Sequence, residues 1–339
     1  MLQKLKTNYR ALKSTAFSKS ETSRENMVLE RVIHDSHAHG DYKAIIDGIT
    51  ALVHQNQFEI AVSYVENYTQ YAFRMENGTP LFFEAAQHLV KIGEIEDTAL
   101  SRLKAYETWR SRQPHCPFAA ASLARAYREI AWVYRGSGWA SSVTEDGWDK
   151  FQHYCALAAR TLQQSANFNT HWYWAQTFLG YALVDCQNAE QVIERHNYVA
   201  QIIPQVPDIY TSTAYALLPR WYGDYIEVEK FARRSADQTA HLFGDGLYAF
   251  INLALLNNYE DLGDLHIDEP RFRKGCHDWL KHFPSQYYRT HMISACYTEG
   301  LYSSAYELIC GLTEFHKNAY DADIDIYCAN GFCKEFYKP

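Results

Sequence analysis

The side chains best suited to metal chemistry lie together near the N-terminus. His34, His37 and His39 follow a His-x-x-His-x-His spacing, and imidazole nitrogen is a common ligand of zinc. The same spacing suits a tract without structure, and the neighbouring Asp41 serves equally well as the N-cap of a following helix. We keep the three histidines as a metal-ligand candidate, and otherwise we expect no metal and no other cofactor.

Two further patterns resemble a calcium-binding loop and a thiolate–imidazole pair, but neither contains what such a site requires. The run Asp321–Asp325 resembles the start of a calcium loop, but Ile326 stands where that loop requires glycine. The neighbours His115 and Cys116 could form a thiolate pair, but adjacency in sequence does not bring two side chains together. The chain contains no phosphate-binding loop and no nucleophile elbow. The sequence therefore predicts a protein that is not an enzyme.

Helical periodicity dominates the elements that would position any site. Apolar residues between Tyr42 and Val53 recur on one face of a helix, and the segment from Phe58 to Tyr68 repeats the pattern. Only 9 prolines and 16 glycines occur, too few for an all-β chain. Further helices are predicted over residues 80–93, 96–112, 117–135, 145–166, 170–186, 188–203, 208–218, 224–241, 244–258, 270–283, 285–299, 301–316 and 322–337.

Three turns carry part of the tetratricopeptide pattern, in which units of about 34 residues pair two helices. A turn residue is followed by a ring two positions later, and in two cases by alanine five positions later: Gly300, Tyr302 and Ala305; Asn56, Phe58 and Ala61; and Gly223 with Tyr225. We therefore expect an all-α, tetratricopeptide-like α-solenoid of stacked antiparallel helix pairs. Residues 36–339 would form a single helical-repeat domain, and residues 1–35 an N-terminal helical arm.

Two longer stretches resemble a known family. The run Arg135–Thr144 leads into Gly147 and Trp148, and the run Leu217–Gly223 leads towards Phe231 and Ala232. Together they resemble the DUF4034 family, a bacterial group of tetratricopeptide-like helical proteins with no assigned activity. The resemblance covers residues 115–260 and implies the helical-repeat fold. The family usually has two glycines after Pro-Arg-Trp, and Tyr222 replaces the first of them here.

The same stretches supply candidate binding side chains. Trp, Tyr and Arg dominate the energetics of protein interfaces, and helix-pair stacks bind partners on a concave face. A joint between helices would also explain these residues without any ligand. As partner-binding candidates we take the rings and arginines of these turns and of the helix between them: Arg135, Trp139, Trp148, Trp172, Trp174, Arg220, Trp221 and Tyr225.

Charge and composition narrow the kind of partner. The formal net charge is −8 with 15 histidines neutral, which disfavours nucleic acid as a ligand and favours a basic protein. The eight cysteines contain no C-x-x-C and are typical of reduced thiols. No signal peptide and no membrane span are evident. We expect a cytoplasmic protein that does not bind a membrane.

The sequence is compatible with two functions. The first is a non-catalytic protein-binding scaffold, and its sharper form is an immunity or antitoxin-like protein that occludes a basic toxin. The alternative is a small-molecule-binding protein or an enzyme with a pocket around Arg135 and Arg220. The two differ in whether these arginines converge on one pocket.

Overall fold

The computed structural model describes residues 32–33, 42–69, 73–75, 77–93, 96–136, 142–182, 186–256, 265–313 and 315–316. Within these residues the fold is all-α, as predicted, with packed neighbouring helix pairs. The helices are α2 (Lys43–His54), α3 (Phe58–Thr69), α4 (Leu81–Gln87), α5 (Glu96–Arg112), α6 (Pro117–Arg135), α7 (Glu145–Gln164), α8 (Trp172–Ala182), α9 (Ala189–Ala200), α10 (Asp208–Ala216), α11 (Tyr225–Phe243), α12 (Gly246–Leu256), α13 (Glu269–His282), α14 (Gln286–Thr298) and α15 (Tyr302–Cys310). A 3-10 turn, η5 (Ala166–Phe168), separates α7 from α8.

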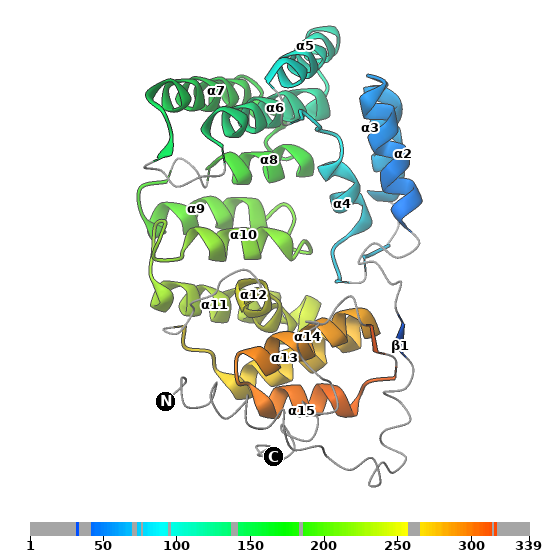
Figure 1. Ribbon diagram of the computed structural model, residues 1–339, viewed down its shortest axis with the longest axis vertical. Coiled ribbons are helices and arrows are strands. Elements are labelled where there is room, and N and C mark those ends of the chain that lie inside the picture. The colour runs from blue at the N-terminus through cyan, green and yellow to red at the C-terminus, as the bar shows by residue number, and fades with distance from the viewer. Residues whose placement is uncertain are drawn as a thin grey trace.

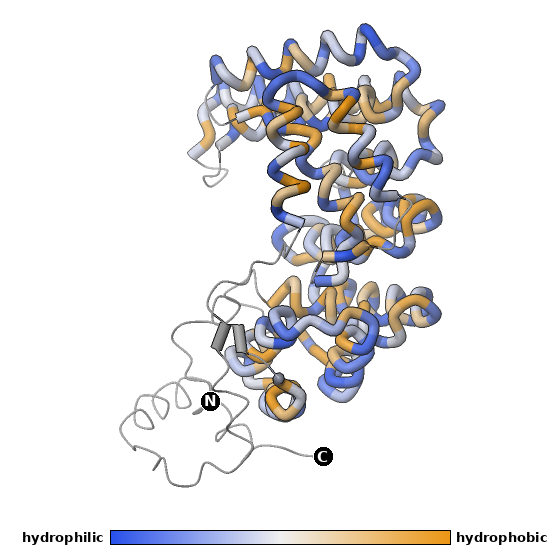
Figure 2. Tube along the Cα trace, turned by 90° about the vertical axis from the view of Figure 1, so that its right-hand side faces the viewer, coloured by the Kyte–Doolittle hydropathy of each residue, from blue (hydrophilic) through white to orange (hydrophobic). Residues whose placement is uncertain are grey.

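The helices form an elongated stack. From α5 to α15 they lie in successive layers, and α2, α3 and α4 stand along one side of the upper layers (Figure 1). Along the trace, hydrophobic residues alternate with hydrophilic ones in many of the helices, as expected for helices that bury one face (Figure 2), whereas α12 is apolar and buried on nearly all sides. None of the described helices is long and apolar enough to cross a membrane.

Side-chain caps fix where several helices begin. The hydroxyl of Thr144 accepts a hydrogen bond from the backbone N–H of Gly147 at 3.1 Å at the start of α7. Asp224 caps α11 in the same way, accepting from the N–H of Glu227 at 2.8 Å. These oxygens satisfy backbone donors that have no partner inside the helix. The starts of α7 and α11 are therefore set by local sequence.

Two of the three predicted tetratricopeptide turns have the expected backbone. Asn56 has a φ of 59° and Gly300 a φ of 77°, both in the left-handed region. The turn at Gly223 differs from these two, because Gly223 is not among the described glycines with positive φ. A Cβ at Gly223 would lie 2.5 Å from the carbonyl oxygen of Leu217. Glycine is needed there for close backbone approach, not for the handedness of the turn.

The predicted bounds of α5 and α6 match the structure, and among the helices that end early, α4 and α15 each end six residues before their predicted ends. The helix expected over 80–93 ends at Gln87, since the following residues are held by α5: the hydroxyl of Tyr106 donates to Leu89 O and accepts from Lys91 N. The helix expected over 301–316 ends at Cys310, and the N–H of Thr313 then bonds the side chain of Gln286 on α14.

Two short strands join distant parts of the chain. Val32–Ile33 (β1) pairs in parallel with Phe315–His316 (β2). Apart from β1, the expected N-terminal arm lies outside the described residues, as does the helix expected over 322–337.

The hydrophobic core consists of two main clusters. One gathers side chains of α2 to α8, with Tyr106 fully buried in it. The other gathers Phe83 of α4 and side chains from α8 to α15, with Trp279 fully buried. Trp172, Phe178 and Tyr198 pack against both clusters. The stack therefore has a continuous core along its length.

The described cysteines agree in part with the expectation of reduced thiols inside the helices. The six described cysteines form no disulfide, and Cys186, Cys276 and Cys296 are buried. Cys310, at the end of α15, is exposed instead of buried. Cys328 and Cys333 lie outside the described residues.

Candidate functional site

The first group of predicted binding residues meets where α6 ends and α7 begins. The guanidinium carbon of Arg135 lies 5.0 Å from the ring centroid of Trp132 and 5.6 Å from that of Trp148. Phe151 packs edge-on against both indoles, at 5.3 Å from Trp132 and 5.7 Å from Trp148. The side chain of Trp132 is 38% exposed. Arg135 and Trp148 therefore belong to one surface cluster of rings around a cation.

Trp132 and Phe151 were missed as members of this cluster. Each lies three residues from a predicted member on the same helix, Trp132 before Arg135 and Phe151 after Trp148. Side chains three apart share a helix face. This spacing was the available signal.

The second group lies at the turn between α10 and α11. Arg220 is exposed, and its guanidinium carbon is 5.9 Å from the ring centroid of Trp221. Trp221 is 51% exposed and Ile226, on the first turn of α11, is 64% exposed. Tyr225 is instead partly buried against the second core cluster. The exposed apolar side chains here are thus Trp221 and Ile226.

Both groups lie along one edge of the stack. The end of α6, the start of α7 and the turn between α10 and α11 are all at the left of Figure 1. We call the set of Trp132, Arg135, Trp148, Phe151, Arg220, Trp221 and Ile226 the aromatic edge.

Of the remaining predicted rings, Trp174 lies in the interior and Trp172 is partly buried against both core clusters. Trp174 is 4% exposed, and its indole N–H donates to the hydroxyl of Ser165 at 3.0 Å. Trp172 packs edge-on against Phe82 at 4.8 Å and Phe118 at 5.7 Å, so it joins α8 to α4 and α6. These two rings stabilise the stack.

The other candidates cannot be placed. Trp139 and the histidines His34, His37 and His39 lie outside the described residues. In the part of the chain that the structure describes, no group of three His, Cys, Asp or Glu side chains could hold a metal ion.

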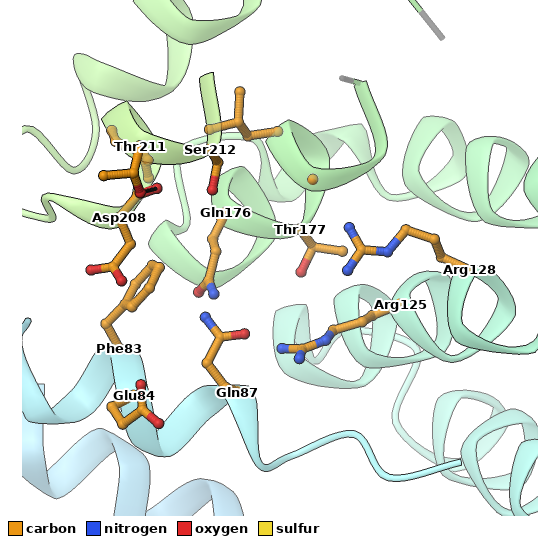
Figure 3. A pocket seen from close by; sticks show the side chains of 13 residues that line it. Phe83, Glu84, Gln87, Arg125, Arg128, Gln176, Thr177, Asp208, Thr211 and Ser212 are labelled. Atoms are coloured by element: carbon orange, nitrogen blue, oxygen red, sulfur yellow. Dashed lines mark hydrogen bonds between the residues drawn. The ribbon is translucent and has the colours of Figure 1, made fainter. Parts of the chain in front are cut away.

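A cavity that the sequence did not predict lies where α4 meets the stack. It has a volume of about 290 Å³ and is lined by side chains of α4, α6, α8 and α10. Figure 3 shows arginines at one side of it and carboxylates at the other. Neither Arg135 nor Arg220 lines this cavity.

The arginine end is formed by Arg125 and Arg128 of α6, whose guanidinium groups point into the cavity (Figure 3). Arg125 Nε bonds Glu129 at 3.3 Å. Burial lowers the pKa of Arg128 to about 10; the charge of Arg125 acts in the same direction, and Glu129 opposes it. Arg128 is still charged at neutral pH. A Cβ at Gly180 on α8 would collide with its guanidinium group, so glycine makes room for this arginine.

The carboxylate end is formed by Asp208 of α10 and Glu84 of α4. Asp208 Oδ2 accepts a hydrogen bond from the hydroxyl of Thr79 at 2.9 Å. Burial raises the pKa of Asp208 to about 6, and the charge of Glu84 adds to this rise, while the bond from Thr79 opposes it. Glu84 lies 3.5 Å from Nε2 of His88.

Amide side chains lie between the two ends. Gln87 of α4 and Gln176 of α8 approach each other across the middle of the cavity (Figure 3). The side-chain oxygen of Gln176 is buried and accepts no hydrogen bond from the protein. An unpartnered buried acceptor is unfavourable, so this oxygen is available to a ligand or to water.

This cavity is hard to predict from sequence because its residues come from four helices that span more than a hundred positions of the chain. One signal was present: Gly180 lies inside α8, where glycine is unfavourable unless packing requires it.

Comparison of the chain with family models, with curated proteins and with solved structures finds no match. The resemblance to the DUF4034 family therefore stays a prediction, and the site is interpreted from its own geometry.

Proposed function

We propose that this chain is a non-catalytic, protein-binding helical-repeat scaffold that engages a basic protein through the aromatic edge. The observation that carries the proposal is the exposure of Trp221, of which 51% is accessible. Burial of a tryptophan ring is a large source of binding free energy, and exposed rings of this size act as interface anchors.

The packing of the aromatic edge supports this role. Arg135 between Trp132 and Trp148 is held by contacts to both rings, and Phe151 packs against both indoles. Side chains that are already positioned lose less conformational freedom on binding than free ones. The cluster therefore presents a preorganised surface, with Trp132 as its most exposed described ring.

Net charge supports a basic partner. At −8 the chain attracts positively charged proteins and accelerates their encounter. In its sharper form the proposal is a cytoplasmic immunity or antitoxin-like protein, of the DUF4034 kind, that occludes a basic toxin.

The test is affinity capture from the native host with the tagged full chain, compared with Trp221→Ala and Trp132→Ala. The matched control is Tyr64→Ala, because Tyr64 on α3 is similarly exposed, at 48%, but lies outside the aromatic edge. We expect one stoichiometric basic protein to be captured by the native chain and the control, and to be lost in both tryptophan variants. Capture that survives both tryptophan substitutions, or the capture of no basic protein, contradicts the proposal.

Co-expression separates the scaffold from the immunity form. If the captured protein is toxic alone and harmless with this chain, the immunity form is supported. If the captured protein is harmless alone, the immunity form is wrong and the scaffold remains.

A further inference from the structure

We infer that the cavity between α4, α6, α8 and α10 binds a small zwitterion, with its anionic group at Arg125 and Arg128 and its ammonium group at Asp208 and Glu84. The aromatic edge is not involved, so this inference is independent of the proposed protein partner.

The arginine end is incomplete without an anion. Among the described residues, no carboxylate forms an ion pair with Arg128, although its side chain is partly buried. A buried charge is costly unless it is paired. Arg125 lies beside it with the same charge, and its Nε is already bonded to Glu129. Two adjacent guanidinium groups that point into one cavity form a binding site for a carboxylate or phosphate oxygen pair.

The carboxylate end has the opposite requirement. In the described part of the chain, the hydrogen-bond donor to the Asp208 carboxylate is a neutral hydroxyl, that of Thr79, and no lysine or arginine pairs with it. Its charged neighbour in the cavity is Glu84, which repels it. A ligand ammonium placed between two carboxylates would favour the charged form of both. The site therefore selects for positive charge at this end.

The separation of the two ends selects the shape of the ligand. Gln87 and Gln176 stand between them (Figure 3), so we expect a ligand whose anionic and ammonium groups are carried on different carbons. The side chains of Phe83 and Leu179 supply apolar wall for a short methylene chain. At about 290 Å³ the cavity is at the small end of ligand sites. These features fit an ω-amino acid better than a peptide or a nucleotide.

The experiment is titration calorimetry of the full chain with 4-aminobutyrate, 5-aminopentanoate and 6-aminohexanoate. Hexanoate and hexylamine, each with one of the two charges, are the matched ligands. We expect at least one ω-amino acid to bind, and both singly charged ligands to bind at least about tenfold more weakly, since each loses one set of charge-assisted hydrogen bonds.

Variants then assign the two ends. Arg128→Met and Asp208→Asn should each weaken binding of the zwitterion by about tenfold or more. Arg160→Met and Asp149→Asn on the exposed face of α7 are matched controls and should leave it unchanged. Circular dichroism confirms that each variant is folded. If no ω-amino acid binds the native chain, or if binding is unaffected in both cavity variants, the inference is wrong.

Discussion

Arginines meet carboxylates in two regions of this molecule, with opposite results. Between α11, α12 and α13, Arg271 bonds Asp245 at 2.9 Å and Asp237 at 2.6 Å, and Arg233 bonds Glu229 at 2.7 Å and Asp268 at 3.0 Å. In the cavity, Arg128 and Asp208 both line the same space but form no ion pair. One region satisfies its charges and the other keeps them apart.

The difference indicates what each region is for. The α11–α13 charges hold helices together: although burial alone would raise the pKa of Asp245, Lys274 and Arg271 keep it below its usual range. In the cavity, burial lowers the pKa of Arg128 and raises the pKa of Asp208, and both shifts favour the neutral form of the side chain. A protein that leaves charges in this condition loses some stability, and binding of a complementary ligand can restore it.

Removal of a paired arginine is expected to have the largest effect on stability. Arg271→Met leaves Asp245 and Asp237 without this partner in a partly buried site, where Arg271 is 17% exposed. We expect the free energy of unfolding to fall by about 2–3 kcal/mol, measured by urea denaturation. The control Lys230→Met breaks the exposed pair with Glu227 and should lower the free energy of unfolding far less than Arg271→Met does. Equal losses in the two variants would contradict a structural role for Arg271.

The next change neutralises the carboxylate end. Because the pKa of Asp208 is about 6 in the folded state and ordinarily 3.8, the folded state binds its proton more tightly than the unfolded state. Stability therefore falls as the pH rises from about 4 to about 6, and this loss is constant above that window. Asp208→Asn removes the loss while keeping an oxygen that can accept from Thr79. The facing charged group Glu84 and the facing Arg125 and Arg128 are unchanged.

We expect Asp208→Asn to be more stable than the native chain by up to about 2 kcal/mol above pH 6, and nearly equal to it near pH 4. Thermal denaturation over this pH range measures the difference. A difference that does not depend on pH would show that Asp208 does not titrate in this window.

Removal of the unpaired arginine is expected to have a smaller effect. Arg128→Met deletes a buried charge that lacks a carboxylate partner among the described residues and keeps a side chain of similar length. We expect the free energy of unfolding to stay equal or to rise by about 1 kcal/mol. Arg160→Met, at an exposed position, is the control. A loss as large as that of Arg271→Met would mean that Arg128 is structural, and the comparison would fail.

The smallest effect on stability is expected at Gly180. Gly180→Ala favours the helix but displaces the guanidinium group of Arg128 from its place beside α8. These effects oppose each other, so the free energy of unfolding should change by less than about 0.5 kcal/mol. Binding of the ω-amino acid should nevertheless weaken, and unchanged affinity in calorimetry would show that the position of Arg128 is unimportant.

Most of the fold could be predicted because its signals are local. Proline at residue 117 and the glycine at 136 bound α6 at its observed ends, and the positive φ of Asn56 and Gly300 follows from residue type and spacing. Gly223 has the same spacing but a different cause, because the carbonyl of Leu217 is close in space. Only the folded chain reveals that contact.

The candidate sites divide in the same way. Arg135 and Trp148 could be found because they flank one turn, and the structure brings them together. The cavity could not be predicted from the sequence, because Arg128 and Asp208 lie 80 positions apart. Each of them looks like an ordinary polar residue of a helix. Burial turns them into a site, and burial of a charged side chain depends on packing between distant helices.

The rings shared by the two core clusters have a consequence for how the chain unfolds. In a stack of helices, stability is approximately a sum of terms for each unit and for each interface between neighbours. Trp172, Phe178 and Tyr198 each pack against both clusters. Loss of one half would expose these rings and weaken the other half. The two halves are therefore expected to melt cooperatively in a single transition.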